Sequence, residues 1–324
     1  MADDKAELDR LLGPLSGLFA NRPVRYAIIA AIVAFMVAAP FVFGSYAAVI
    51  LTNALLYVVL ALGLNVVVGY AGLLDLGYAA FFAVGAYTVG ILTQYGVNFW
   101  LTLPIALCVA AMAGVIIGGP TLRLRSDYLA IVTLGFGEIV RLSARNLSIT
   151  GKASGISGIE QPWLFGWHIT GSLSFYFVFC ILAALAVFVS FRLADSRLGR
   201  AWLYVRHDED AAEAMGINRV SVKLAAYVIG AIFGATGGAF FAVNLGAISP
   251  ESFSFTQSVL ILMAVILGGM GKIPGVILGA LIVILGPELL RDLGEFRLLV
   301  FAVGLLLIML FRPSGIWPGR GAAK

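Results

Sequence analysis

The chain has 324 residues, of which 61% are hydrophobic and 12% are charged, whereas a soluble globular domain is about 45–50% apolar and about 25% charged. The mean hydropathy is +1.02, and continuous apolar runs long enough to cross a bilayer, about 20 residues, recur along the sequence. Because these runs do not alternate between apolar and polar residues, a β-barrel is excluded. The composition predicts an all-α, polytopic integral membrane protein.

The first 25 residues mix acidic and basic side chains and show no small-residue cleavage site, so they do not resemble a signal peptide. Two interpretations stay open for this segment: a short amphipathic helix over residues 8–19 on a membrane surface, or a tail without regular structure. We expect an N-terminal segment over 1–25, a transmembrane domain over 26–312 and a tail over 313–324.

The transmembrane domain is predicted to hold about ten spans, each close to the length that a bilayer requires. Several of them are short or rich in glycine, so eight or nine full crossings are the alternative. The predicted spans cover residues 26–43, 47–69, 72–94, 101–119, 128–147, 173–192, 224–246, 256–270, 275–290 and 297–311.

Orientation follows from the basic residues in the short loops, which stay on the cytoplasmic side. On one side lie Arg22, Arg25, Arg123, Arg125, the charged stretch 192–223, Lys272, Arg312 and Arg320. The other side has Lys152 as the one lysine or arginine of loop 148–172, an uncharged turn at 94–100, and a tight turn at 291–296 with Arg291 and Glu295. Both termini and residues 192–223 are therefore expected in the cytoplasm, and the basic pI reflects topology rather than nucleic-acid binding.

Two stretches, 66–87 and 265–283, follow one plan and suggest a weak internal repeat. Each has an apolar helix that ends in G-x-x-G, at Gly69 and Gly72 or at Gly268 and Gly271, followed by a turn and a helix of small residues. Duplicated halves and broken helices are common in transporters. We expect helix breaks at these glycines. The other glycines inside spans, such as those of Gly-x-x-x-Gly pairs, predict tight helix packing.

The sequence contains no complete motif for nucleotide binding or metal binding. Around GGMGKIPG, residues 268–275, a phosphate-binding loop would need Gly at position 266 and Ser or Thr at position 273, but the chain has Ile266 and Ile273. The two histidines, His168 and His207, have no Cys or His partner at metal-ligand spacing. We therefore expect no cofactor and no catalytic site in this chain.

Ionisable and amide side chains at membrane depth are candidates for a substrate route, because such residues are rare there. They are Asn65, Asp75, Glu138 and Asn244. For Asp75 the alternative is an N-cap at a turn, and for the two asparagines it is hydrogen bonding between helices. Glu138 and Arg141 lie three apart on one helical face, so they are expected to pair, either as structure or within the route.

Residues 192–223 carry eleven of the 38 charged residues of the chain. Asp208, Glu209 and Asp210 favour a helix N-terminus, alanines follow, and Gly216 is a natural stop. This predicts a helix–turn–helix with a short amphipathic helix whose small residues suit another protein's groove. A surface helix without a partner is the alternative.

Within the charged stretch, residues 210–216 resemble a pattern of a known protein family. Residues 210–216, DAAEAMG, are similar to the E-A-A-x-x-x-G coupling loop of ABC importer permeases, with Asp210 in the place of Glu and without the downstream I-x-L-P. Over residues 45 to 316 the chain resembles the M-type permease of bacterial branched-chain amino acid (Liv) importers. The segments that carry this resemblance are 60–87, 123–142, 197–218, 265–280 and 305–316.

One block departs mildly from the family pattern. In NLSITGKASGI, residues 146–156, Lys152 and Ser154 stand at variable points, whereas Asn146, Thr150, Gly151, Gly155 and Ile156 match. A substrate other than leucine, isoleucine or valine therefore stays open, including another amino acid. The permease group for urea and other amides resembles the chain less well.

The resemblance implies a type II ABC importer-like permease in the bacterial inner membrane. It implies a homologous H-type permease, two cytosolic ATPases that bind the ATP, and a periplasmic binding protein. It assigns ATPase coupling, within loop 193–223, to Asp210, Ala211, Ala212, Glu213, Ala214, Met215 and Gly216. Loop 148–172, with Trp163 and Trp167, is the expected dock for the binding protein. A stand-alone secondary transporter is the alternative, but only Asp75 and Glu138 offer charge at depth for ion coupling.

Overall fold

The computed structural model describes residues 22–121, 126–164, 167–312 and 315–316. The predicted helix over 8–19, the loop residues Arg123 and Arg125, and most of the predicted tail lie outside the described residues. The chain divides into two compact units, residues 1–49 and residues 50–324. In the first unit, the described residues 22–49 belong to α2 (Arg22–Leu64), which is helical except at Gly44, whose φ is 77°.

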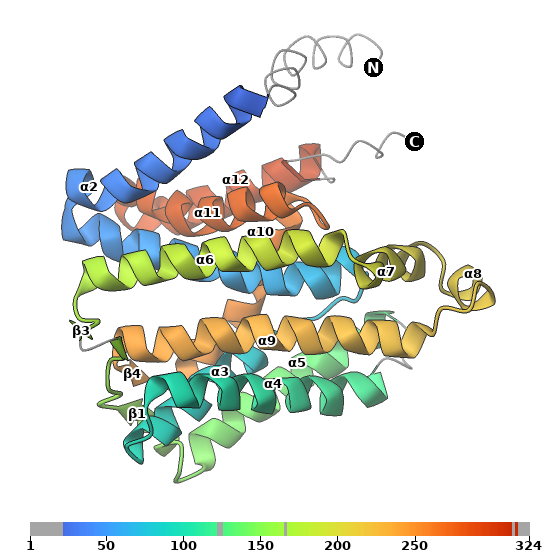
Figure 1. Cartoon of the computed structure of the whole chain (residues 1–324), viewed down its shortest axis with the longest axis horizontal. Helices are drawn as coiled ribbons and strands as arrows, with labels where there is room; N and C mark the ends of the chain where they lie inside the picture. The colour runs from blue at the N-terminus through green and yellow to red at the C-terminus, as the bar shows by residue number, and fades with distance from the viewer. Residues whose placement is uncertain (1–21, 122–125, 165–166, 313–314, 317–324) are drawn as a thin grey trace. The chain divides into compact units, whose positions relative to one another are not determined.

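The second unit is built almost entirely from helices (Figure 1). It continues with residues 50–64 of α2 and the π-helix η1 (Asn65–Tyr70). The α-helices that follow are α3 (Ala79–Gln94), α4 (Phe99–Thr121), α5 (Ser126–Asn146), α6 (Ser172–Ala194), α7 (Arg197–His207), α8 (Glu209–Ala214), α9 (Arg219–Leu245), α10 (Phe255–Gly268), α11 (Ile273–Leu289) and α12 (Arg297–Phe311).

Short elements connect these helices. The 3-10 helices are η2 (Lys152–Ser154), η3 (Pro250–Phe253) and η4 (Arg291–Phe296). Strand β1 (Ile156–Ser157) pairs antiparallel with β4 (Ala247–Ile248). Strand β2 (Trp163–Leu164) pairs antiparallel with β3 (Trp167–His168). The first of these pairs joins loop 148–172 to the segment that follows α9.

Five helical stretches within the described residues are long and apolar enough to cross a membrane: Gly44–Tyr70, Phe99–Pro120, Ser172–Ala194, Arg219–Leu245 and Pro250–Gly268. Shorter apolar helices cover Ala79–Gln94, Ile273–Leu289 and Leu299–Ile308. Helix α5 is outside both groups; it carries Glu138, Arg141 and Arg145. The predicted all-α, polytopic membrane architecture is confirmed.

Helix α9 forms the centre of the second unit, with α3 and α4 packed against it through glycine. A Cβ on Gly238 of α9 would overlap the carbonyl oxygen of Phe82 in α3. A Cβ on Gly114 of α4 would lie 3.2 Å from the Cβ of Ala231. The predicted tight packing is confirmed, because these backbones approach too closely for larger side chains.

The helix breaks predicted at the two G-x-x-G sites are also confirmed. Helix α10 ends at Gly268, and the turn that follows contains Gly271 with a φ of 83°. After η1 the chain leaves the helix at Gly72, with a φ of 72°, and the next helix begins only at Ala79. The span predicted from residue 72 is wrong at its start, because left-handed backbone at Gly72 stops the helix and residues 73–78 run irregularly.

Candidate functional site

The charged stretch 192–223 folds into the predicted helix–turn–helix. Helices α7 and α8 lie at one end of the second unit, beyond the ends of α6 and α9 (Figure 1). The Asp208 Oδ1 accepts hydrogen bonds from the backbone N–H groups of Asp210 and Ala211, both at 3.0 Å. Helix α8 stops before Gly216, which has a φ of 82°. Both predicted helix signals are confirmed.

The exposed face of α8 differs from the predicted one at Ala212. This side chain is 2% exposed, whereas Met215 is 72% exposed. Because α8 packs against α9, the small Ala212 faces the rest of the chain and lets the two helices approach. The other predicted coupling residues are exposed: Asp210, Ala211, Glu213, Ala214, Met215 and Gly216.

Ion pairs hold α8 to the start of α9. Lys223 Nζ lies 2.5 Å from Glu209 Oε1, and the Lys223 side chain is only 6% exposed. Arg219 contacts Glu213 at 3.2 Å and Asp210 at 3.5 Å, at more exposed positions. Sequence reasoning missed these pairs, although their opposite charges were visible. Much of the charge of this stretch is thus used within the chain.

Beneath α7, the two helix breaks meet. The Gly271 N–H donates a hydrogen bond of 2.8 Å to Asn65 Oδ1. An Arg206 Nη1–H donates to the carbonyl oxygen of Gly69. We call this meeting point of Asn65, Gly69, Arg206 and Gly271 the break junction. The glycine patterns predicted the two breaks, but nothing in the sequence indicated that they contact each other.

The candidate Asp75 lies in the irregular segment between η1 and α3 and is 1% exposed. Its Oδ1 accepts a hydrogen bond of 2.8 Å from the Gly77 N–H, and its Oδ2 has no hydrogen-bond partner among the described residues. The N-terminus of α3 is instead capped from α10, where Ser258 Oγ accepts from the Ala79 N–H at 2.9 Å. The N-cap interpretation of Asp75 is therefore wrong.

The two asparagine candidates for the substrate route, Asn65 and Asn244, differ in how deeply they are buried. Asn65 is fully buried, and within the described part of the chain its Nδ2 has no hydrogen-bond partner. Asn244 is half-buried near the C-terminal end of α9. Only Asn65 belongs to the break junction.

Glu138 and Arg141 of α5 pair as predicted, with Oε2 and Nη2 separated by 2.8 Å. Arg141 also contacts Glu251 of η3 at 3.2 Å, a partner that the sequence did not indicate. Glu138 lines a cavity of about 10 Å³ together with Leu76 and Ser258. That volume suits one water molecule and is far too small for an amino acid.

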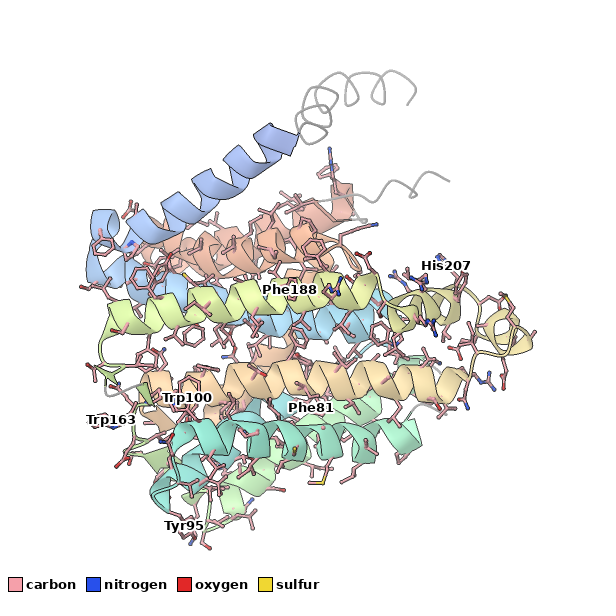
Figure 2. The ribbon with its side chains drawn as sticks, viewed as in Figure 1. Phe81, Tyr95, Trp100, Trp163, Phe188 and His207 are labelled. Carbon is pink, nitrogen blue, oxygen red and sulfur yellow. The ribbon has the colours of Figure 1, made fainter. Side chains whose placement is uncertain are left out.

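The expected docking loop lies at the opposite end of the helices from the charged stretch. Figure 2 shows Trp100 and Trp163 near one end and His207, the last residue of α7, near the other. The Trp100 Nε1–H donates to the Trp163 carbonyl oxygen at 2.7 Å, and Trp163 is 50% exposed. Of Trp167 the structure describes the backbone, in β3.

Long apolar helices, glycine-mediated packing and two broken helices together define a polytopic membrane protein of the kind typical of permeases. Residues 46–311 match the family described as branched-chain amino acid transport system / permease component. The chain belongs to this family, which confirms the resemblance found in its sequence.

Relatives with curated names agree with this assignment. The chain is 43% identical over 313 residues to the high-affinity branched-chain amino acid transport system permease protein LivM of Salmonella typhimurium, covering 89% of this chain and 74% of the relative. LivM of Escherichia coli K12 gives the same identity and coverage. LivH of Escherichia coli K12 is 26% identical over 288 residues, covering 80% and 90%. No solved structure matches the chain.

Proposed function

We propose that this chain is the non-catalytic membrane permease subunit of an ATP-driven importer of branched-chain amino acids. The names of its relatives support the substrate class, since both LivM and LivH are described as permeases of a branched-chain amino acid transport system. That two permeases carry this description also supports a pore formed by this chain and a homologous H-type partner. Residues 26–312 would form the permease domain, between cytoplasmic segments at 1–25 and 313–324.

The single observation that carries the proposal is the exposed, capped helix α8 at one end of the helices. Its exposed face consists of Ala211, Ala214 and Met215 with acidic neighbours, and short amphipathic helices of this kind bind in grooves of partner proteins. We assign its partner as a cytosolic ATPase, so that ATP binds there and this chain holds no cofactor. Closure of the ATPases would shift α7 and α8 and bias the pore between two states.

Orientation in the bacterial inner membrane follows from the same arrangement. The charged stretch lies at the end opposite Trp163, and basic residues in short loops favour the cytoplasmic side. Loop 148–172 would then face the periplasm. There Trp163 and Trp167 would contact the binding protein that delivers the amino acid.

The substrate route is assigned to the polar groups Asn65, Asp75, Glu138 and Asn244, of which Asn65 and Asp75 are buried and the other two half-buried. Asn65 Nδ2 and Asp75 Oδ2 support this, because each is buried without a hydrogen-bond partner among the described residues, and such groups are costly unless something else binds them. A branched-chain amino acid is a zwitterion with an aliphatic side chain. It therefore offers charged groups that these polar atoms would bind, together with apolar surface. The main specificity would reside in the binding protein.

Uptake by the reconstituted complex tests the proposal. Proteoliposomes with both permeases, the ATPases and the binding protein should accumulate labelled leucine and valine only when ATP is supplied on the ATPase side. Preferential uptake of urea would assign the chain to amide transport instead. Uptake by this chain without ATPases would identify a stand-alone transporter and refute the proposal.

A further inference from the structure

The inner face of α7 is fixed to the first helix break. Trp202 is fully buried, and its ring stacks on Tyr70 of η1 with the centroids 6.4 Å apart and an angle of 5° between the planes. Its Nε1–H donates to the Val222 carbonyl oxygen at 2.7 Å, which ties it to α9 as well. A displacement of α7 therefore acts directly on η1.

Arg206 lies one turn of α7 after Trp202 and makes a second contact with the first helix break. A Cβ on Gly72 would lie 2.8 Å from the Arg206 Cγ, so the stem of this side chain runs across Gly72. The guanidinium then donates to the Gly69 carbonyl oxygen. Carbonyl groups at a helix end lack intrahelical donors, and a cation is favoured there by the partial negative charge. The hydrogen bond is charge-assisted and hence strong.

The second break lies against the same guanidinium. A Cβ on Gly271 would lie 3.4 Å from the Arg206 Nη1 and 3.1 Å from the Gly69 carbonyl oxygen. The Gly271 N–H is meanwhile bound to Asn65, at the start of η1. Arg206 therefore lies where the two broken helices touch. Glycine at 72 and 271 leaves room for its side chain, and glycine at 69 leaves room for Asn65 and Gly271.

We infer that Arg206 is a positioning residue that transmits displacement of α7 and α8 to the break junction. When α7 moves, the hydrogen bond of Arg206 to the Gly69 carbonyl oxygen displaces the first break relative to the second. The contact between these two breaks sets the state of the pore. The inference rests on the proposed function, because it takes an ATPase on α8 as the source of the displacement. Asp208 is the one residue between α7 and α8, so the two helices move as a short connected pair.

The test replaces Arg206 with glutamine in the reconstituted complex, and Arg200→Gln is the matched control. Arg200 lies on the same helix and also donates to a carbonyl, that of Asp195 at 2.8 Å, but this carbonyl lies outside the break junction. The readout is the number of ATP molecules hydrolysed per amino acid imported. We expect Arg206→Gln to raise it about tenfold, the factor that the loss of a hydrogen bond to a charged group implies, and Arg200→Gln to leave it at the wild-type value. An unchanged ratio for Arg206→Gln, or an equal rise for both variants, overturns the inference.

A second measurement uses the wild-type complex and so does not depend on how well a variant folds. Amide hydrogen exchange over residues 69–73 and 269–272 is compared between the nucleotide-free and nucleotide-trapped complexes. We expect faster or slower exchange at both breaks together, and equal rates in the two states would overturn the inference. A wild-type complex without ATP-dependent uptake would instead refute the proposed function, so the two failures are distinguishable.

Discussion

The ion pair between Lys223 and Glu209 is expected to set how firmly α8 is held. Lys223 is 6% exposed, whereas the Glu209 side chain is 46% exposed. Removing one partner of a fully buried pair costs about 3–5 kcal/mol, and an exposed pair contributes about 0–1 kcal/mol. For this half-buried pair we expect Glu209→Gln to cost about 2 kcal/mol, which lies between these limits.

A loss of about 2 kcal/mol corresponds to a change of about 30-fold in the equilibrium between docked and undocked α8. Hydrogen–deuterium exchange of the amides over residues 209–217, in lipid nanodiscs, measures this opening. We expect their protection to fall by about 30-fold, while exchange over α9 beyond its first turn stays unchanged because that helix is held by other contacts.

The control is Asp210→Asn, which removes the weaker contact of Arg219 with a side chain that is 95% exposed. It should lower the protection by no more than about fivefold, the upper end for an exposed pair. Equal protection in wild type and Glu209→Gln would refute the reasoning. So would an effect of Asp210→Asn as large as that of Glu209→Gln.

Three further substitutions test packing and the substrate route. Ser258→Ala removes the cap at the start of α3 and should lower the unfolding free energy by about 1–3 kcal/mol in detergent. Ser254→Ala should have little effect, because the Ser254 side chain makes no capping hydrogen bond among the described residues. Gly238→Ala should destabilise by about 1–3 kcal/mol through overlap with the α3 backbone. By contrast, Gly135→Ala inside α5, whose Cβ would meet nothing within 4 Å in the described part of the chain, should stabilise its helix by up to about 1 kcal/mol. Glu138→Gln should reduce labelled leucine uptake far more than it reduces the amount of assembled complex.

A specific result would contradict each of these three predictions. Equal unfolding free energies for Ser258→Ala and Ser254→Ala would show that the cap contributes nothing. A stabilising Gly238→Ala would show that α3 and α9 separate without cost. Parallel losses of uptake and assembly in Glu138→Gln would make its pair with Arg141 purely structural.

Local signals in the sequence predicted most of the helices, because span length, caps and stop residues act on neighbouring residues. Asp208 and Gly216 bound α8 as expected, and the G-x-x-G glycines break their helices as expected. The start of α3 was misplaced by several residues, since apolar character continues through 72–78 while the backbone leaves the helix at Gly72.

Contacts between segments distant in the sequence were the part that could not be predicted. The cap of α3 comes from Ser258, and Arg141 binds Glu251, because tertiary packing brings together residues that no local pattern links. Ala212 shows the same limit within a single helix. A helix of six residues gives too little periodicity to indicate which alanines face α9 and which face outward.

The most direct test of the account is a photocrosslink from α8 in intact cells. A photoreactive amino acid at Met215, which is 72% exposed, should capture a cytosolic ATPase subunit, and the same group at Trp163, at the other end of the helices, should not. Capture of the ATPase from Met215 in cells that import leucine is the result that the account predicts. Import that continues while Met215 never captures an ATPase would contradict it.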